Sequence, residues 1–399
     1  MLRLKLQQVF DYAWKGYAAS FCPSPVQRKA ASSLMACKSG KLGCNVSVCT
    51  DCGHLDFHNN SCRNRNCPNC QAFLKELWID ARKAEVIDAP YFHVVFTIPA
   101  QLNPLVYANQ SLLYSLLHKC SAQTLLELSA DRKFLGATPG IIQILHTWGQ
   151  ELNFHPHIHC IVSGGRLSRD GKLRICGKGF FIPAKVLAAK FRGKLLSSLD
   201  SLHKAGKLSF SPSCSRLQNP ASWARLKDTL YSTAWCPDIR ETFNGLGNAI
   251  EYLGRYANRI AITNARVKKV SPDSVTFTAK DYKNNSALKE VALSNEEFIR
   301  RFMMHVLPPG FQKIRYYGFL SNRHRKENLS IIFRIQGHQR FTSMLAGLPM
   351  GEAIYKVWGY KNMGRDDRYV PHSLSFQRHL NLSLLQNFKK GFPISRKAP

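Results

Sequence analysis

Acidic residues are scarce in this chain of 399 residues: 25 Asp and Glu stand against 56 Lys and Arg, which gives a formal charge of +31. No apolar run approaches the ~18 residues of a membrane span, so we expect no membrane partner. The N-terminus also lacks the apolar centre and small-residue cleavage site of a signal peptide, which favours a cytoplasmic protein. Such an excess of positive charge is typical of proteins that bind a polyanion such as DNA or RNA.

Two further motifs are missing. The sequence has no G-x-x-x-x-G-K-[ST] phosphate loop, so we expect no helicase activity of its own, and strand separation would need a host helicase. The His-x-His-x-Asp-His pattern of metallo-hydrolases is also excluded, because Cys160 and Ile161 follow His159. A wholly disordered chain is excluded by a hydrophobic content of 45% with 11% aromatics, and the length of 399 residues is enough for two or three domains.

Cysteine, by contrast, is plentiful and clustered, with eight of the 13 Cys in the first 70 residues. Two C-x-x-C pairs, Cys49 with Cys52 and Cys67 with Cys70, are separated by 14 residues, which is typical of a four-cysteine site for structural Zn²⁺. The segment between the pairs is too polar to fold by burial alone, so metal binding would supply its folding energy. The alternative ligands in this region are Cys62, Cys44, His54 and His58.

Histidines alternate along a second segment, at His155, His157 and His159. On a β-strand these three positions share one face, and buried neutral imidazoles need polar partners, which a metal ion provides. His146 lies on the preceding strand candidate, so a hairpin turning near residues 150–154 would place it beside this face. We therefore predict a divalent metal site formed by His146, His157 and His159, with His155 as the alternative third ligand.

Tyr252 and Tyr256 are four residues apart and would share one face of a helix, as would Arg255 and Arg259. A phenol has an ordinary pKa of about 10, so a nucleophilic tyrosine needs a metal ion or an arginine to stabilise its developing charge. Attack on a DNA phosphodiester would give a phosphotyrosine and free a 3′-OH. A tyrosine pair alone is more often explained by packing, and it gains weight here from the histidine strand and the charge.

These elements together resemble the transposases of the insertion sequence 91 family, which are related to insertion-sequence common-region elements and, more remotely, to Helitrons. The resemblance covers roughly residues 45–320, and the matching segments occur in the family's order. They are CTDCG…SCRNRNCPNCQ, FHVVFTIP, LHTWGQELNFHPHIHCIVSGG, EYLGRYANRIAI and EEFIRRFMMHVLPPGFQKIRYYGFL.

The resemblance implies a HUH (His-hydrophobe-His) endonuclease of the two-tyrosine type. His157-Ile158-His159 matches the HUH motif, and Tyr252 and Tyr256 match the tyrosine pair. The implied activity is rolling-circle transposition, in which single-stranded DNA is cut at an element end through a 5′-phosphotyrosine intermediate, with Mg²⁺ or Mn²⁺ at the histidines. The common-region relatives keep the tyrosine before the R-I-A-I stretch, which favours Tyr256 as the main nucleophile.

The expected partner is single-stranded DNA at the transposon ends and at the target, in a bacterial cytoplasm. The candidate phosphate contacts are Arg255, Arg259, Arg63 and Arg65. Two alternatives remain at this point. One is a zinc-dependent DNA-binding regulator without catalysis, and the other is a plasmid rolling-circle replication initiator with the same chemistry.

The resemblance implies an antiparallel sheet flanked by helices with the histidine strand in its centre, and the alternation of helices and strands agrees with an α+β fold. The proposed domains are a helical and zinc-binding domain (1–88), a nuclease domain (89–340) and a basic C-terminal appendage (341–399). We also predict a strand at 259–263, a strand pair within 266–293, and a helix capped by Ser294 with Glu297 three residues later.

Overall fold

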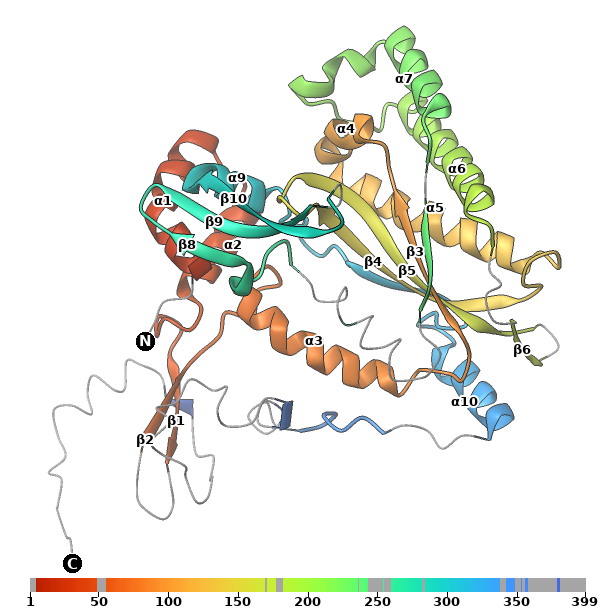
Figure 1. Ribbon diagram of the computed structural model, residues 1–399, viewed down its shortest axis with the longest axis horizontal. Coiled ribbons are helices and arrows are strands. Elements are labelled where there is room, and N and C mark those ends of the chain that lie inside the picture. Colours follow the sequence, from red (N-terminus) through yellow and green to blue (C-terminus); the bar gives the residue numbers. More distant parts are fainter. Residues whose placement is uncertain are drawn as a thin grey trace, which may run out of the picture. The chain divides into compact units, whose positions relative to one another are not determined.

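The computed structural model describes residues 5–48, 55–168, 171–176, 182–235, 237–242, 254, 260–281, 284–337, 342–348, 353, 356–357 and 379–380. These residues belong to two compact units (Figure 1). Unit 1 is formed by residues from 1–74, 262–303 and 347–399, and unit 2 by residues from 75–261 and 304–346. The domain limits 1–88, 89–340 and 341–399 stay a prediction.

Unit 2 contains an antiparallel sheet in the order β11-β4-β5-β3-β7, with a short β6 paired to β5. The histidine-bearing β5 is therefore central, as predicted. Long apolar segments in β3, β4 and β5 can occupy this position because both faces of the sheet are covered. The strands of the sheet are β3 (Tyr91–Thr97), β4 (Thr138–Trp148), β5 (Phe154–Leu167), β6 (Leu173–Ile175), β7 (Asp238–Thr242) and β11 (Ile314–Gly318).

One face of this sheet packs against α5 (Gln110–Ala130) and α6 (Ala184–Lys204) (Figure 1). Ile158, Cys160 and Val162 alternate along β5 and point into this core, where each is fully buried. The remaining helical elements of this unit before β7 are η1 (Ala100–Leu102), α4 (Asn103–Ala108), η2 (Pro212–Gln218) and α7 (Pro220–Ser232).

The opposite face carries a second core cluster. Ile144 on β4 and Ile161 on β5 pack there with Ile79, which lies in the second half of α3 (Pro68–Lys83). The helix α10 (Arg325–Gln336) contributes Leu329 and Ile332 to the same cluster. Because side chains alternate along a strand, the odd-numbered residues of β5 and the even-numbered residues of β4 share this face.

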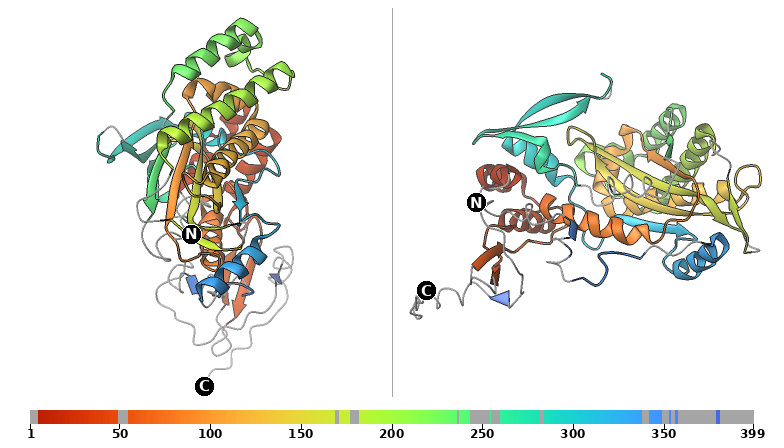
Figure 2. Two further views of the ribbon diagram at one scale, coloured as in Figure 1. Left: turned by 90° about the vertical axis from the view of Figure 1, so that its right-hand side faces the viewer. Right: turned by 60° about the horizontal axis from the view of Figure 1, so that its bottom comes forward.

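Unit 1 combines helices with a three-stranded antiparallel sheet in the order β10-β9-β8. Helix α9 lies between this sheet and α1, which the right-hand view of Figure 2 shows. Phe10 and Phe302 meet edge to face between α1 and α9, with ring centroids 5.6 Å apart. The elements are α1 (Lys5–Phe21), α2 (Pro25–Ala36), η3 (Asn264–Arg266), β8 (Val267–Val270), β9 (Ser274–Asp281), β10 (Ala287–Ser294) and α9 (Asn295–Met303).

Local sequence explains where these helices begin. Ser24 and Gln27 form a capping box at α2, with Pro25 in the first turn. The predicted cap at Ser294 is confirmed, because its hydroxyl accepts a hydrogen bond from the Glu297 backbone N–H at 3.3 Å. Unit 1 also holds a small antiparallel sheet formed by β12 (His379–Leu380), β1 (Cys44–Val48) and β2 (Leu55–Asn59).

Two secondary-structure predictions need correction. The segment 266–293 forms three strands where we predicted a pair. The predicted strand at 259–263 is wrong over its described part, because residues 260–263 form no strand. Ile260, Ala261 and Ile262 are all buried, so this apolar run fills core space without the in-out alternation of a half-buried strand.

Candidate metal centres

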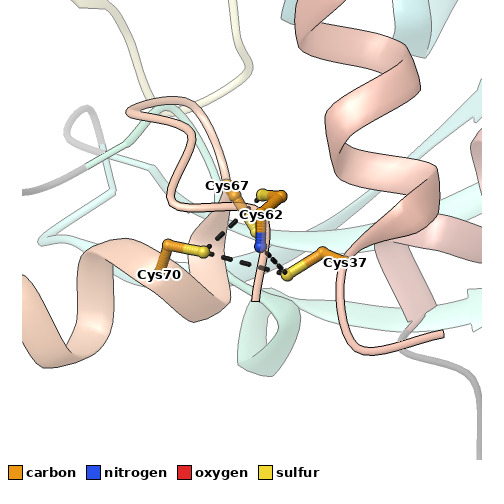
Figure 3. Close-up of side chains that lie close together, drawn as sticks. All are labelled: Cys37, Cys62, Cys67 and Cys70. Atoms are coloured by element: carbon orange, nitrogen blue, oxygen red, sulfur yellow. Dashed lines mark hydrogen bonds between the residues drawn. The ribbon is translucent and has the colours of Figure 1, made fainter. Parts of the chain in front are cut away.

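Four cysteines of unit 1 converge where α2 ends and α3 begins (Figure 3). Cys37 is the residue directly after α2, and Cys70 lies in the first turn of α3. Cys62 and Cys67 come from the loop between β2 and α3. Their four Sγ atoms all lie within 4.8 Å of one another, and the thiols themselves form a small buried cluster.

The loop geometry follows from its polar sequence. Arg63 adopts a left-handed backbone with φ +53°, and the Asn64 side chain accepts a hydrogen bond from the Asn66 backbone N–H at 2.9 Å. Pro68 then starts α3, so Cys67 and Cys70, three residues apart, lie at the helix N-terminus. Partial positive charge at that end favours thiolates. The side chains of Arg63 and Arg65 are exposed on this loop.

The donor set fits a zinc ion. Sγ of Cys70 lies 3.8 Å from Sγ of Cys37 and 3.6 Å from Sγ of Cys62. Four sulfurs at about 2.3 Å from a central Zn²⁺ in a tetrahedron would be ~3.8 Å apart. Cys37 and Cys67 are 0% and 1% exposed, so the cluster is closed to solvent on these sides. This is the geometry of a structural rather than a catalytic zinc site.

Electrostatics explains why four thiols this close need a cation. The pKa of Cys37 is lowered to about 7, chiefly because the thiol of Cys62 is its hydrogen-bond partner. The pKa of Cys67 is raised, mainly because Cys37, Cys62 and Cys70 compete with it as hydrogen-bond partners. Four thiolates cannot coexist there without a positive ion, since like charges at this distance repel. Backbone N–H groups of Cys62 and Asn64 point at Sγ of Cys37 and Cys62, both at 3.4 Å, which is suited to sulfur anions.

The cluster overlaps only in part with the predicted set. It contains Cys67, Cys70 and the alternative ligand Cys62, and it adds Cys37, which was not among the predicted ligands. Cys37 has no neighbouring cysteine in the sequence, so nothing in the spacing indicated it. Cys44 is buried but not part of the cluster. The predicted ligands and alternatives outside the described residues are Cys49, Cys52 and His54, and the side chain of His58 is likewise not described.

Three histidines of unit 2 form the second centre. The register pairs His146 on β4 with His157 on β5, and His159 lies two residues further on the same face. One ring nitrogen from each lies within 4.8 Å of the other two. His146 and His159 are buried and His157 is half-buried. The structure therefore brings together the three predicted ligands.

A hydrogen bond fixes which nitrogen of His157 faces the cluster. Nδ1 of His157 donates to the carbonyl oxygen of His155 at 2.7 Å, so its Nε2 carries a lone pair. That Nε2 lies 3.0 Å from Nε2 of His159. Two nitrogens that each bind the same ion at a nitrogen–ion distance of 2.0–2.1 Å, with a nitrogen–ion–nitrogen angle of about 90°, would be ~3 Å apart. The two Nε2 atoms therefore fit a shared cation. His155 contributes its carbonyl oxygen, and its ring is not part of the cluster.

The end of the β4–β5 hairpin is held by a separate set of contacts. The indole of Trp148 stacks on His146, with ring centroids 4.5 Å apart. His305 receives a hydrogen bond from Thr147 at its Nδ1 (3.2 Å) and donates from Nε2 to the Leu152 carbonyl at 3.1 Å. Burial lowers the pKa of His305 to about 4, so it is neutral at pH 7. The stacked indole restricts the ring of His146.

The predicted tyrosines and their arginines, Tyr252, Tyr256, Arg255 and Arg259, lie outside the described residues. One residue between the tyrosines is described: Gly254 is helical and buried. A methyl group at Gly254 would overlap the side chain of Ile79. Ile79 belongs to the core cluster on the sheet face that carries the three imidazoles.

Fold and donor sets define a strongly basic α+β protein with a closed four-thiol centre and a separate three-imidazole centre. Comparison with known proteins supplies the family. A family model described as "Transposase zinc-binding domain" matches residues 9–98, and one described as "Putative transposase" matches residues 140–328. The chain belongs to the insertion sequence 91 family of transposases, which act on DNA.

Two relatives illustrate the match. "Putative transposase y4qJ" of Sinorhizobium fredii (strain NBRC 101917 / NGR234) is 41% identical over 308 residues, which is 77% of each chain. The "Transposase for insertion sequence element IS801" of Pseudomonas savastanoi pv. phaseolicola is 28% identical over 302 residues, covering 75% of this chain and 71% of that protein. No solved structure matches the chain. Among the described residues, no helix is both long and apolar enough to span a membrane.

Proposed function

We propose that this transposase cuts single-stranded DNA at the ends of its element by tyrosine attack and moves the strand by rolling-circle transposition. The observation that carries the proposal is the convergence of His146, His157 and His159 on one sheet face. Gly254, between the two tyrosines, packs against Ile79 of the core on that same face. The family membership supports the same activity.

The chain's own residues would perform the cut as follows. The imidazoles would hold a divalent ion, Mg²⁺ or Mn²⁺, which would supply positive charge at the scissile phosphate. The phenol oxygen of Tyr256 would bond to phosphorus and lose its proton to solvent water. The bond to the 3′ oxygen would break, and that oxygen would take a proton from water and leave as a 3′-OH. Tyr252 provides a second nucleophile, so two DNA ends can be held in turn, and Arg255 and Arg259 contact phosphates.

The zinc centre would stabilise the DNA-binding unit. We propose that Cys37, Cys62, Cys67 and Cys70 hold one Zn²⁺, because these four sulfurs lie within 4.8 Å of one another and could complete one tetrahedral shell. In that case neither Cys49 nor Cys52 is needed at this ion. The exposed side chains of Arg63 and Arg65 would contact the DNA backbone, which makes binding fall steeply with salt. A host helicase would open the strands.

A denaturing gel tests this function. Purified protein is mixed with single-stranded oligonucleotides from the flanking element ends, with Mn²⁺ or with EDTA. We expect a covalent protein–DNA band that needs metal, weakens or disappears in Tyr256→Phe and is absent in His157→Ala. Tyr231→Phe is the matched control, because Tyr231 is an exposed tyrosine on α7. A band that persists when Tyr252 and Tyr256 are both replaced by Phe would reject the tyrosine assignment.

A further inference from the structure

A fourth imidazole lies behind the metal centre and is not one of its three ligands. Nε2 of His93 on β3 lies 2.8 Å from Nδ1 of His159 on β5. His93 is only 3% exposed, and His159 is 8% exposed. The register pairs Val95 with His159, so His93 is the diagonal neighbour of His159 on the same sheet face. Side chains in diagonal positions of antiparallel strands are within reach of each other.

The two rings form an edge-to-edge hydrogen bond rather than a stack. Their planes differ by 7° and their centroids are 5.1 Å apart. The nitrogens of His93 and His159 are closer than two stacked rings can approach, so the contact runs through the ring edges. In that arrangement one nitrogen must carry the proton and the other must accept it.

The proton direction follows from the inward-facing nitrogens. Nε2 of His157 is unprotonated, because its Nδ1 donates to the His155 carbonyl oxygen. If Nε2 of His159 also presents a lone pair to a shared cation, then Nδ1 of His159 carries the proton. Nε2 of His93 must then be the acceptor. The backbone carbonyl oxygen of His155 therefore accepts the Nδ1–H of His157, just as Nε2 of the His93 side chain would accept the Nδ1–H of His159.

We propose that His93 is a positioning residue that accepts the Nδ1–H of His159 and so holds its Nε2 toward the metal ion. The inference rests on the proposed three-histidine metal site. When no cation is present, Nε2 of His159 carries a proton and donates it to Nε2 of His157. In that state Nε2 of His93 donates to Nδ1 of His159. Ion binding releases the proton on Nε2 of His159, and the proton between the rings passes from His93 to Nδ1 of His159. His93 regains one proton at Nδ1, so both rings stay neutral.

Metal affinity measures this role apart from activity. The zinc-loaded full chain is titrated with Mn²⁺, and the electron paramagnetic resonance signal of free Mn²⁺ gives the dissociation constant. We expect His93→Leu to raise that constant by about 10- to 100-fold, as loss of a partner to a metal-ligating histidine does. His93→Gln should recover most of the affinity, because its amide oxygen also accepts a hydrogen bond. His203→Leu, on α6 away from the cluster, should bind like the unmodified protein.

The Mn²⁺ titrations distinguish failure of the three-histidine metal site from failure of the positioning role of His93. If the unmodified protein binds no Mn²⁺, the metal site itself fails. If it binds Mn²⁺ and His93→Leu binds equally well, or if His93→Gln is as weak as His93→Leu, the positioning role is wrong.

A second measurement needs no substitution. In the unmodified protein labelled with ¹⁵N-histidine, a second equivalent of Zn²⁺ should convert Nε2 of His93 from a protonated to an unprotonated nitrogen. A nitrogen that stays protonated would overturn the proposal even if the leucine variant failed to fold.

Discussion

The two donor clusters of this transposase differ in how they are closed. The thiol cluster offers four sulfurs, enough to complete a tetrahedral shell, and Cys37 and Cys67 in it are almost fully buried. The imidazole cluster offers three nitrogens, and one of its rings, His157, is half-buried. A complete shell serves structure, whereas a shell with open positions can accept a substrate oxygen.

Their surroundings differ as well. The thiols are themselves the buried core of their loop, so little else in that region can replace a lost ion. The imidazoles project from two neighbouring strands, β4 and β5, of a sheet that is packed on both faces by apolar clusters. Loss of its metal ion should therefore unfold the region around the thiol cluster. Loss of the ion from the imidazole cluster should abolish the activity without unfolding the sheet.

The largest effect should come from the thiol cluster. Cys70→Ser should release the zinc and unfold the surrounding loop, because structural zinc contributes about 10–16 kcal/mol of apparent binding energy to small zinc domains. Zinc content and a circular dichroism melting curve check this.

Two matched variants sharpen the zinc test. Cys44→Ser also changes a buried thiol of unit 1 but should keep the zinc, because Cys44 lies outside the cluster. Cys49→Ser should keep it as well. Loss of zinc in Cys49→Ser would contradict the ligand set proposed here.

Removal of an imidazole should act on metal binding alone. We expect His146→Ala to weaken Mn²⁺ binding more than ~100-fold, or about 3 kcal/mol, while zinc content and melting temperature stay close to those of the unmodified protein. His203→Ala controls for loss of an imidazole elsewhere in unit 2. A His146→Ala protein that unfolds at the growth temperature would show that the two centres do not differ as described.

Acid should weaken unit 2 through its buried histidines. The pKa of His305 falls from about 6.5 in the unfolded chain to about 4 in the folded one, because burial disfavours the charged ring. Between pH 6.5 and 4 the unfolded chain therefore binds a proton at this residue and the folded chain does not. The free energy of unfolding falls as the pH falls through this range, by roughly 3 kcal/mol at pH 4.

Urea titrations over this pH range measure the effect of His305 directly. The slope of the free energy of unfolding against pH should become shallower in His305→Gln. A slope identical to that of the unmodified protein would contradict the assignment of a neutral, buried His305.

The smallest effect concerns the tyrosine segment. Gly254→Ala would press a methyl group against Ile79 and cost about 1–3 kcal/mol by overpacking, with a lower yield of the covalent DNA adduct. The additional change Ile79→Ala should restore much of the yield. Gly193→Ala on α6 is the control: its added methyl group meets nothing within 4 Å, so we expect a slight gain in stability. An adduct yield unchanged by Gly254→Ala would show that the segment around residue 254 does not take part in the reaction.

Much of this architecture is readable from local sequence. Alternation along β5 and the turn before it predicted that His146, His157 and His159 share one face, and the register confirms the arrangement. The cap at Ser294 was equally visible, because capping depends on residues three positions apart. Patterns of this kind depend on neighbours in the chain.

The features that the sequence did not predict depend on contacts between segments that are distant along the chain. Cys37 joins Cys62 across 25 residues, and no C-x-x-C spacing marks it. His93 looked like an ordinary strand residue until β3 was placed beside β5. The run Ile260–Ile262 looked like a strand, but full burial of successive residues overrides alternation.

The most direct test of the account is to find the amino acid that carries the DNA. After reaction with Mn²⁺ and a single-stranded element end, the adduct is digested with nuclease and trypsin and analysed by mass spectrometry. Arg255 separates the two tyrosines, so trypsin yields Tyr252 in peptide 241–255 and Tyr256 in peptide 256–259. We predict a nucleotide phosphate on Tyr256, formed only with metal and not in His157→Ala. A modification on neither peptide, or one formed equally in EDTA, would contradict the tyrosine nuclease.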